Sequence, residues 1–179
     1  AAAALGEAAP TATTQRTPLR APASAQEFVS RVQDDAKAAE AATGIPAAFM
    51  IAQAAHETGW GRKHIKMADG SNSFNLFGIK AFFFNDTATT EITTTEVIDG
   101  KAQKVKAKFR AYSSYEESFK DYAKLMQDSP RYQGVMANAK SAEGFAQGLQ
   151  RAGYATDPQY ANKLSKVINT TLRLQRALT

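Results

Sequence analysis

Three glutamates of this chain have the residue type and the setting for acid–base chemistry, and Glu57 comes first. The string Ala54-Ala55-His56-Glu57-Thr58-Gly59-Trp60-Gly61 puts its carboxyl in the last turn of an apolar helix. The partial negative charge of a helix C-terminus disfavours ionisation, and apolar neighbours such as Trp60 would add a desolvation effect of the same sign. A carboxylic acid that stays protonated near neutral pH suits a general acid. Taken alone, the position is more often that of a surface glutamate beside a helix stop.

Glu91 and Glu96 lie in a segment rich in β-branched residues that predicts a strand. Their separation is odd, so on a regular strand they face opposite sides. Glu96 shares its side with Ile92, Thr94 and Ile98. If either glutamate faced Glu57 across a cleft, the pair could hydrolyse a glycosidic bond, with one acid protonating the leaving oxygen and the other carboxylate activating water or stabilising the transition state. Taken alone, each is more typical of a solvated strand residue than of a catalytic group.

Other polar and aromatic candidates have ordinary structural alternatives. His56 is more often a packed or surface histidine than a base or a ligand. Tyr154 and Tyr160 bracket a short loop and could contact a sugar, although Tyr160 fits a core position equally well. The alternating basic residues of the 104–110 segment are expected to form a solvated sheet face.

The elements that must position these residues follow from caps and periodicity. Helices are predicted from a capping box at Ser24 and Glu27 to Gly44, and from Pro46 to about Gly59. Two strands flank the turn Asp99-Gly100, which is a strong hairpin signal. Three further helices are predicted to begin at Ser114, Ser141 and Asp157-Pro158. We therefore expect an α+β domain over residues 24–179, with a helical lobe and a small β-lobe at about 89–111.

Composition limits the function classes. The 179 residues are 44% hydrophobic and 22% charged, with a formal net charge of +5, which suits an anionic polymer but lacks the dense basic patch of a nucleic-acid binder. The absence of cysteine excludes a disulfide scaffold, a cysteine nucleophile and a thiolate metal site. We expect no metal, no cofactor, no nucleic-acid partner and no membrane-spanning helix. The Ala/Thr/Pro-rich residues 1–23 predict a disordered linker. Because the first residue is not Met and no signal peptide is recognised, the chain is interpreted as an excised or processed fragment.

Several strings, in order, resemble a known family. These are the Gln53–Gly61 helix end, Asn75-Leu76-Phe77-Gly78-Ile79-Lys80-Ala81, Thr93-Thr94-Thr95-Glu96, the 107–112 segment and the 152–161 segment. Together they resemble the flagellum-specific peptidoglycan hydrolases of glycoside hydrolase family 73, over about residues 25–172. One stretch departs from the family pattern: Phe82-Phe83-Phe84-Asn85-Asp86-Thr87-Ala88-Thr89-Thr90 stands where the family has a polar loop with Trp and Gly. Glu91 directly follows this stretch and is assigned no role by the resemblance.

The resemblance implies a lysozyme-like fold with a groove between a helical lobe and a β-hairpin lobe. The implied activity is that of an endo-β-N-acetylglucosaminidase acting on peptidoglycan glycan strands. Glu57 falls on the family's general acid, Glu96 on the β-lobe carboxylate and Tyr154 on the cleft tyrosine. We expect Trp60, Asn75, Phe77 and Tyr160 to contribute to substrate binding.

The family also implies a biological setting. The enzyme would be a periplasmic monomer that opens the wall for the flagellum, and flagellar rod proteins would be its partners through an N-terminal domain absent here.

Three alternative functions stay open: a lytic transglycosylase that needs Glu57 only, a reaction in which the substrate's own N-acetyl group is the nucleophile, and a catalytically silent peptidoglycan-binding module. An unrelated helical adaptor with surface acids fits the ordered strings poorly.

Overall fold

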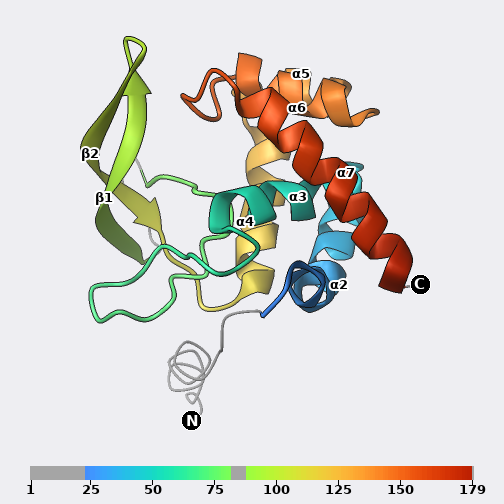
Figure 1. Ribbon diagram of the computed structural model, residues 1–179, viewed down its shortest axis with the longest axis horizontal. Helices are drawn as coiled ribbons and strands as arrows, with labels where there is room; N and C mark the ends of the chain where they lie inside the picture. Colours follow the sequence, from blue (N-terminus) through green and yellow to red (C-terminus); the bar gives the residue numbers. More distant parts are fainter. Residues whose placement is uncertain (1–22, 82–87, 179) are drawn as a thin grey trace.

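The computed structural model describes residues 23–81 and 88–178, and the predicted linker lies outside this range apart from Ala23. Phe82, Phe83 and Phe84 also lie outside it. A helical lobe and a separate β-hairpin make up the described part (Figure 1). The elements are α2 (Ala25–Thr43), α3 (Ala47–Thr58), β1 (Thr89–Ile98), β2 (Lys101–Arg110), α4 (Tyr115–Asp128), the 3-10 helix η1 (Pro130–Tyr132), α5 (Gln133–Ala137), α6 (Ala142–Arg151) and α7 (Tyr160–Leu178).

The first two helices form where their caps predict. The Ser24 hydroxyl accepts from the backbone N–H of Glu27 at 3.1 Å, and the Glu27 carboxylate accepts from the N–H of Ala23, the residue before the N-cap, at 2.9 Å, so Ser24 and Glu27 cap the helix together. Gly44 ends α2 in the left-handed conformation with φ 80°. The next helix, α3, is buried over almost its whole length and packs against α2 and α7. It is therefore the central helix of the lobe, and its C-terminal end carries Glu57.

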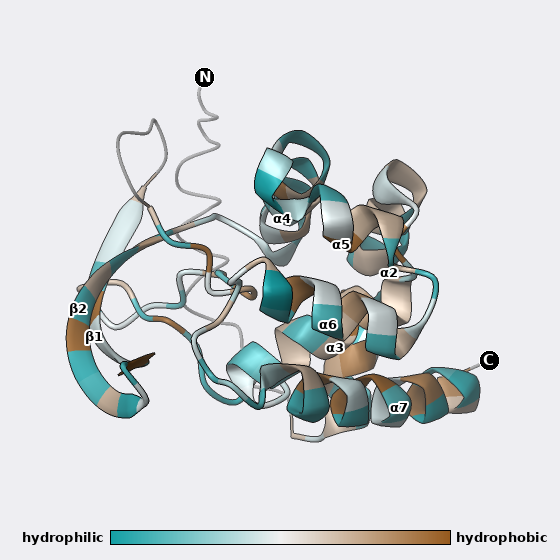
Figure 2. Ribbon diagram, turned by 90° about the horizontal axis from the view of Figure 1, so that it is seen from above, coloured by the Kyte–Doolittle hydropathy of each residue, from teal (hydrophilic) through white to brown (hydrophobic). Residues whose placement is uncertain are grey.

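The hairpin is a regular antiparallel ladder in which Glu96 pairs with Gln103. Its turn has positive φ at both Asp99 (53°) and Gly100 (78°), as a type I′ turn requires. The hairpin stands to one side of the helices and curves toward them (Figure 2). Glu96 lies on the half-buried side with Ile92 and Thr94, whereas Glu91 is exposed.

One prediction for the second strand is wrong. Lys104, Lys106 and Lys108 are exposed as expected, but Arg110 is half-buried. Its guanidinium forms an ion pair with Asp121 of α4 at 2.7 Å. The alternation of polar and apolar residues along a strand predicts which face of the sheet a side chain takes, but not whether another element covers that face. At the end of β2, Asp121 of α4 contacts the outer face and partly buries Arg110.

The C-terminal helices complete the core. Ser114 and Ser141 cap α4 and α6 through their hydroxyls, and Pro130 opens η1 where α4 has ended. The short helix α5 was not predicted, because five residues are too few to show a helical period. The last helix, α7, packs across α3 and α6. The architecture is α+β, as expected, and within the described residues no helix is long and apolar enough to cross a membrane.

Candidate active site

A cavity of about 470 Å³ lies between the end of α3, the hairpin and the loop between α6 and α7. Glu57 and Glu96 both line it, the first from the helical lobe and the second from β1. The other lining residues are His56, Ile65, Phe77, Gly78, Lys80, Ile92, Thr94, Thr95, Val97, Phe109, Gly153, Tyr154, Ala155, Thr156, Asp157 and Tyr160. The fold thus brings together two carboxyl groups that are 39 positions apart in sequence (96 − 57).

Glu57 is the second-last residue of α3, and Gly59 ends the helix in the left-handed conformation with φ 56°. The side chain is exposed toward the cavity, and on its other side the Gly78 backbone lies close against its carboxyl group. Desolvation therefore raises the pKa of Glu57 to about 7, and the negative charge of Glu96 acts in the same direction. A substantial fraction of Glu57 is then protonated at neutral pH, as a general acid needs.

Gly78 lies directly against this carboxyl group. A Cβ atom placed on Gly78 would come within 2.9 Å of Glu57 Oε1, and the residue has a φ of +66°. The positive φ favours glycine, and any added side chain would also force the Glu57 carboxyl to move. The Gly78 segment therefore sets where the Glu57 carboxyl can lie.

Glu96 has a contrasting environment. Lys80 Nζ donates to Glu96 Oε2 at 2.8 Å, and the Thr156 hydroxyl donates to Glu96 Oε1 at 2.9 Å. Desolvation alone would raise the pKa of Glu96, but the hydrogen bonds from Lys80 and Thr156, together with the Lys80 charge, lower it overall. Glu96 is therefore ionised at neutral pH.

The two environments push the two carboxyl groups toward opposite protonation states. A protonated acid and an ionised carboxylate in one cavity are the two groups needed to protonate a leaving oxygen and to assist attack at the other side of a sugar. No group of three His, Cys, Asp or Glu side chains in the described ranges could hold a metal ion. The chemistry that these side chains support is acid–base catalysis.

The loop beneath Glu57 is held by Asn75. The Asn75 amide donates to the carbonyls of Ile79 at 2.9 Å and Arg110 at 2.8 Å, and its oxygen accepts from the N–H of Ile79 at 3.1 Å. Asn75 is 2% exposed. Its contacts therefore fix the turn that contains Gly78.

The predicted aromatic residues divide between the cavity and the core. The Tyr154 ring lines the cavity, and its hydroxyl donates to the Phe77 carbonyl. Phe77 is fully buried and stacks on Tyr122 with ring centroids 4.1 Å apart. Tyr160 borders the cavity but is 1% exposed and belongs to the core, with its ring stacked on Tyr154 and edge-on to His56. Trp60 packs edge-on against Phe28 and is not among the residues that line the cavity.

Sequence reasoning missed Gly78, Lys80 and Thr156 as site residues. Gly78 and Lys80 belong to a string that was used only to support the family resemblance, and Thr156 lies in the loop between two assigned tyrosines. Their contacts with Glu57 or Glu96 join segments that are distant in sequence. His56, by contrast, is half-buried at the cavity edge, and burial, followed by the Lys163 charge, lowers its pKa.

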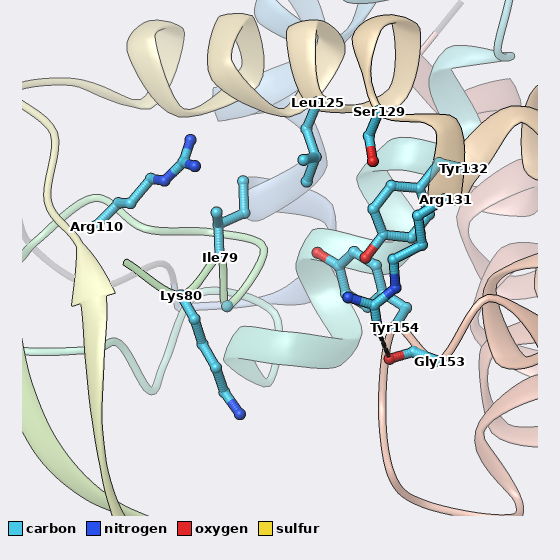
Figure 3. Close-up of a pocket in the computed structure, with 10 residues that line it drawn as sticks. Ile79, Lys80, Arg110, Leu125, Ser129, Arg131, Tyr132, Gly153 and Tyr154 are labelled. Atoms are coloured by element: carbon cyan, nitrogen blue, oxygen red, sulfur yellow. Dashed lines mark hydrogen bonds between the residues drawn. The ribbon is translucent and has the colours of Figure 1, made fainter. Parts of the chain in front are cut away.

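Two further cavities adjoin the central one. A cavity of about 190 Å³ shares Glu57 and Gly78 with it and extends toward Lys63 and His64. A cavity of about 310 Å³ shares Gly78, Lys80, Gly153 and Tyr154 with it and extends toward α4 and η1 (Figure 3). The cavity that holds the two carboxyl groups thus has two neighbours that share its lining residues, and such a series of adjoining cavities suits a chain-like substrate.

An α+β fold in which an acid and a carboxylate line one cavity is the arrangement expected of a glycoside hydrolase. The model of the glucosaminidase family, described as mannosyl-glycoprotein endo-β-N-acetylglucosaminidase, matches residues 33–173. The chain belongs to this family, and it is a glycoside hydrolase domain.

Individual relatives agree with this assignment. The chain is 48% identical over 145 residues to the peptidoglycan hydrolase FlgJ of Pseudomonas aeruginosa. The aligned region covers 81% of this chain and 36% of that protein. A solved structure of a peptidoglycan hydrolase mutant from Sphingomonas sp. A1 matches with a TM-score of 0.80 and 43% identity, over 85% of this chain and 99% of that one. The solved structure of the C-terminally truncated glycoside hydrolase domain of Salmonella typhimurium FlgJ matches with a TM-score of 0.68 and 45% identity, over 84% of this chain and 99% of that one. The expected lysozyme-like fold is confirmed.

Proposed function

We propose that this domain is an endo-β-N-acetylglucosaminidase that cleaves peptidoglycan strands after N-acetylglucosamine. The observation that carries this proposal is the presence of two carboxyl groups in one cavity with opposite surroundings: Glu57 lies against Gly78 with its pKa raised, and Glu96 is held by Lys80 and Thr156 with its pKa lowered. The names of the relatives supply the polymer, because the curated FlgJ protein and the Sphingomonas protein are both called peptidoglycan hydrolases. The chain spans about a third of the Pseudomonas relative, so the substrate is part of the proposal.

In the proposed reaction Glu57 donates its proton to the glycosidic oxygen as the bond to the anomeric carbon breaks. Glu96 carries the negative charge that stabilises the positive charge developing on the sugar ring, or that activates the attacking water. Proton transfer leaves Glu57 ionised near Glu96. The hydrolytic water then restores the proton to Glu57, either directly or through Glu96.

Lys80 and Thr156 support this reaction through Glu96. Their hydrogen bonds hold both carboxylate oxygens and favour the ionised form. Asn75 and Gly78 act on the other acid by fixing the turn against which Glu57 lies. Tyr154 offers its ring to the sugar from the cavity wall, because its hydroxyl is already donated to the Phe77 carbonyl. We assign these residues to positioning and binding, and only the two glutamates to chemistry.

The biological setting belongs to the same proposal. A wall hydrolase related to FlgJ would act in the periplasm, where it would open peptidoglycan for the flagellar rod, in a longer protein with a rod-binding domain. The formal net charge of +5 would favour a polymer that carries peptide carboxylates.

The experiment is digestion of purified peptidoglycan by the wild type, Glu57→Gln and Glu96→Gln, followed by mass spectrometry of the fragments. Reducing ends of N-acetylglucosamine are expected from the wild type, with at least a hundredfold loss for Glu57→Gln and a strong loss for Glu96→Gln. Glu91→Gln, an exposed glutamate on the same strand, is the matched control and should leave the activity unchanged.

Other products would overturn the proposal in defined ways. Anhydro-muramic ends would assign a lytic transglycosylase, which needs Glu57 alone. Full activity of Glu96→Gln would indicate that the substrate's own N-acetyl group is the nucleophile. Binding of peptidoglycan without cleavage would identify a silent binding module.

A further inference from the structure

The cavity beside the catalytic one has a wall of basic and apolar side chains (Figure 3). Its volume of about 310 Å³ is at the lower end of the range for small-ligand sites, about 300–1,000 Å³. Lys80, Arg110 and Arg131 line it, and its lining contains no carboxylate. Ile79, Leu125, Tyr132 and Tyr154 supply the apolar surface. It adjoins the catalytic cavity at Gly78 and Tyr154, so a branch of a bound substrate could enter it.

Charge pairing singles out Arg131 among the three cations. Lys80 is paired with Glu96 at 2.8 Å, and Arg110 is paired with Asp121 at 2.7 Å. Arg131 has no ion pair within the residues that the structure describes. The cavity therefore carries one uncompensated positive charge on its wall.

The Arg131 guanidinium is also held in place before any ligand arrives. Its Nε donates to the Ala152 carbonyl at 2.7 Å and its Nη2 to the Gly153 carbonyl at 2.6 Å. The group lies over the Tyr132 ring, 5.4 Å from the centroid. A planar guanidinium fixed by two carbonyls loses little further freedom when a carboxylate binds.

Gly153 shows that this arrangement depends on the local sequence. Its φ is +76°, and a Cβ atom there would lie 3.0 Å from Arg131 Nη2. The positive φ strains any other residue at this position, and an added Cβ would make the guanidinium shift by a few tenths of an ångström. The placement of the cation is therefore matched to glycine in the segment that also presents Tyr154.

We infer that this cavity binds the peptide branch of the glycan strand, with Arg131 pairing with a peptide carboxylate. This inference rests on the proposed function, because it presumes a peptidoglycan strand in the catalytic cavity. Sugar hydroxyls are neutral and give no reason for an unpaired cation, whereas the peptides on muramic acid carry free carboxylates. Guanidinium and carboxylate form charge-assisted hydrogen bonds, and the apolar wall suits alanine methyl groups. The substrate class is therefore peptide-bearing strands rather than bare glycan.

The test compares two substrates made from the same peptidoglycan: peptide-bearing strands, and bare strands whose peptides an amidase has removed and whose lactyl carboxylates, which that cleavage frees, have then been amidated. For the wild type, kcat/KM should be about tenfold higher on the peptide-bearing strands, which corresponds to one charge-assisted contact. Arg131→Gln should lose most of this preference while changing kcat/KM on bare strands less than twofold. Arg131→Lys keeps the charge and should retain part of the preference. Arg151→Gln, which removes an exposed charge from α6, is the matched control.

A substrate-side arm makes the test independent of any effect on folding. Amidation of the peptide carboxylates should lower the wild-type kcat/KM to the value for bare strands. The inference is overturned if amidation has no effect, or if Arg131→Gln lowers cleavage of both substrates equally, which would indicate a sugar contact or a role in holding Tyr154. Failure of the wild type to cleave either substrate would instead overturn the proposed function.

Discussion

The Thr156 hydroxyl connects the two lobes at the carboxylate of Glu96. It donates to Glu96 Oε1 at 2.9 Å and accepts from the backbone N–H of Val97, also at 2.9 Å. Thr156 belongs to the loop between α6 and α7, whereas Glu96 and Val97 belong to β1. The same hydroxyl therefore positions the carboxylate and fixes the hairpin against the helical lobe beside Glu57.

Removal of this hydroxyl should impair catalysis more than folding. We expect Thr156→Val to lower kcat about tenfold, since Glu96 loses one of its two side-chain hydrogen bonds and the hairpin loses its link to the loop. The acidic limb of the pH–rate profile should move to higher pH, because the lost hydrogen bond favoured ionised Glu96. Steady-state kinetics across pH measure both effects. Thr156→Ser should restore them, and a threonine that only fills space would show neither the shift nor the rescue.

Gly78→Ala should separate active-site geometry from stability. The added Cβ would lie 2.9 Å from Glu57 Oε1, and Glu57 can relieve this by swinging its side chain away. The expected result is a loss of kcat of about a hundredfold, with a fall in the free energy of unfolding of only about 1–2 kcal/mol from the positive φ.

Gly70→Ala is the control for that substitution. Gly70 also has a positive φ, +87°, but nothing lies within 4 Å of the added Cβ. It should cost similar stability, measured by urea unfolding, and leave kcat unchanged. Equal kcat values for the two variants would contradict the role given to Gly78.

The pH dependence of kcat/KM should be bell-shaped. Activity requires protonated Glu57 and ionised Glu96, so the basic limb should fall near pH 7 and the acidic limb should lie below the ordinary glutamate value of 4.5. Lys80→Met removes a hydrogen bond and a positive charge from Glu96, so it should shift the acidic limb to higher pH. A basic limb that lies near pH 5 would contradict the assignment of Glu57 as the acid.

The raised pKa of Glu57 should also appear in stability. A carboxyl group whose pKa is higher in the folded state favours folding at pH values below its unfolded pKa and loses that contribution as pH rises through the folded pKa of about 7. Glu57→Gln should therefore unfold like the wild type near pH 4 and be more stable by about 1 kcal/mol at pH 8, a value reduced because the side chain opens on solvent. Urea unfolding of both proteins at pH 4 and at pH 8 measures this difference. Equal stability of Glu57→Gln and the wild type at pH 8 would contradict the prediction.

Much of the fold follows from short-range signals. The capping boxes at Ser24 and Ser114, the Asp99-Gly100 turn and the odd separation of Glu91 and Glu96 are each set by nearby residues, and the structure agrees with them. Arg110 shows the limit of such signals, because the carboxylate that pairs with it comes from α4.

The cause of the Glu57 pKa shift also depended on tertiary contacts. The sequence predicted the correct direction, from a helix end and the neighbouring Trp60. In the structure Trp60 packs on Phe28, and the shift comes from desolvation of the carboxyl and the charge of Glu96. Likewise, the hydrogen bonds of Lys80 and Thr156 span 16 and 60 residues, so no local pattern could show that they converge on Glu96.

The most direct test of the central claim is NMR titration of the Glu57 carboxyl group in the wild type and in Glu96→Gln, with ¹³C-labelled glutamate and Glu57→Gln for assignment. We predict a pKa of about 7 for Glu57 in the wild type, and a lower value in Glu96→Gln that stays above 4.5, because the repulsion is removed but the desolvation remains. A wild-type value near 4.5 would mean that Glu57 is ionised at neutral pH. That result would contradict its assignment as the general acid.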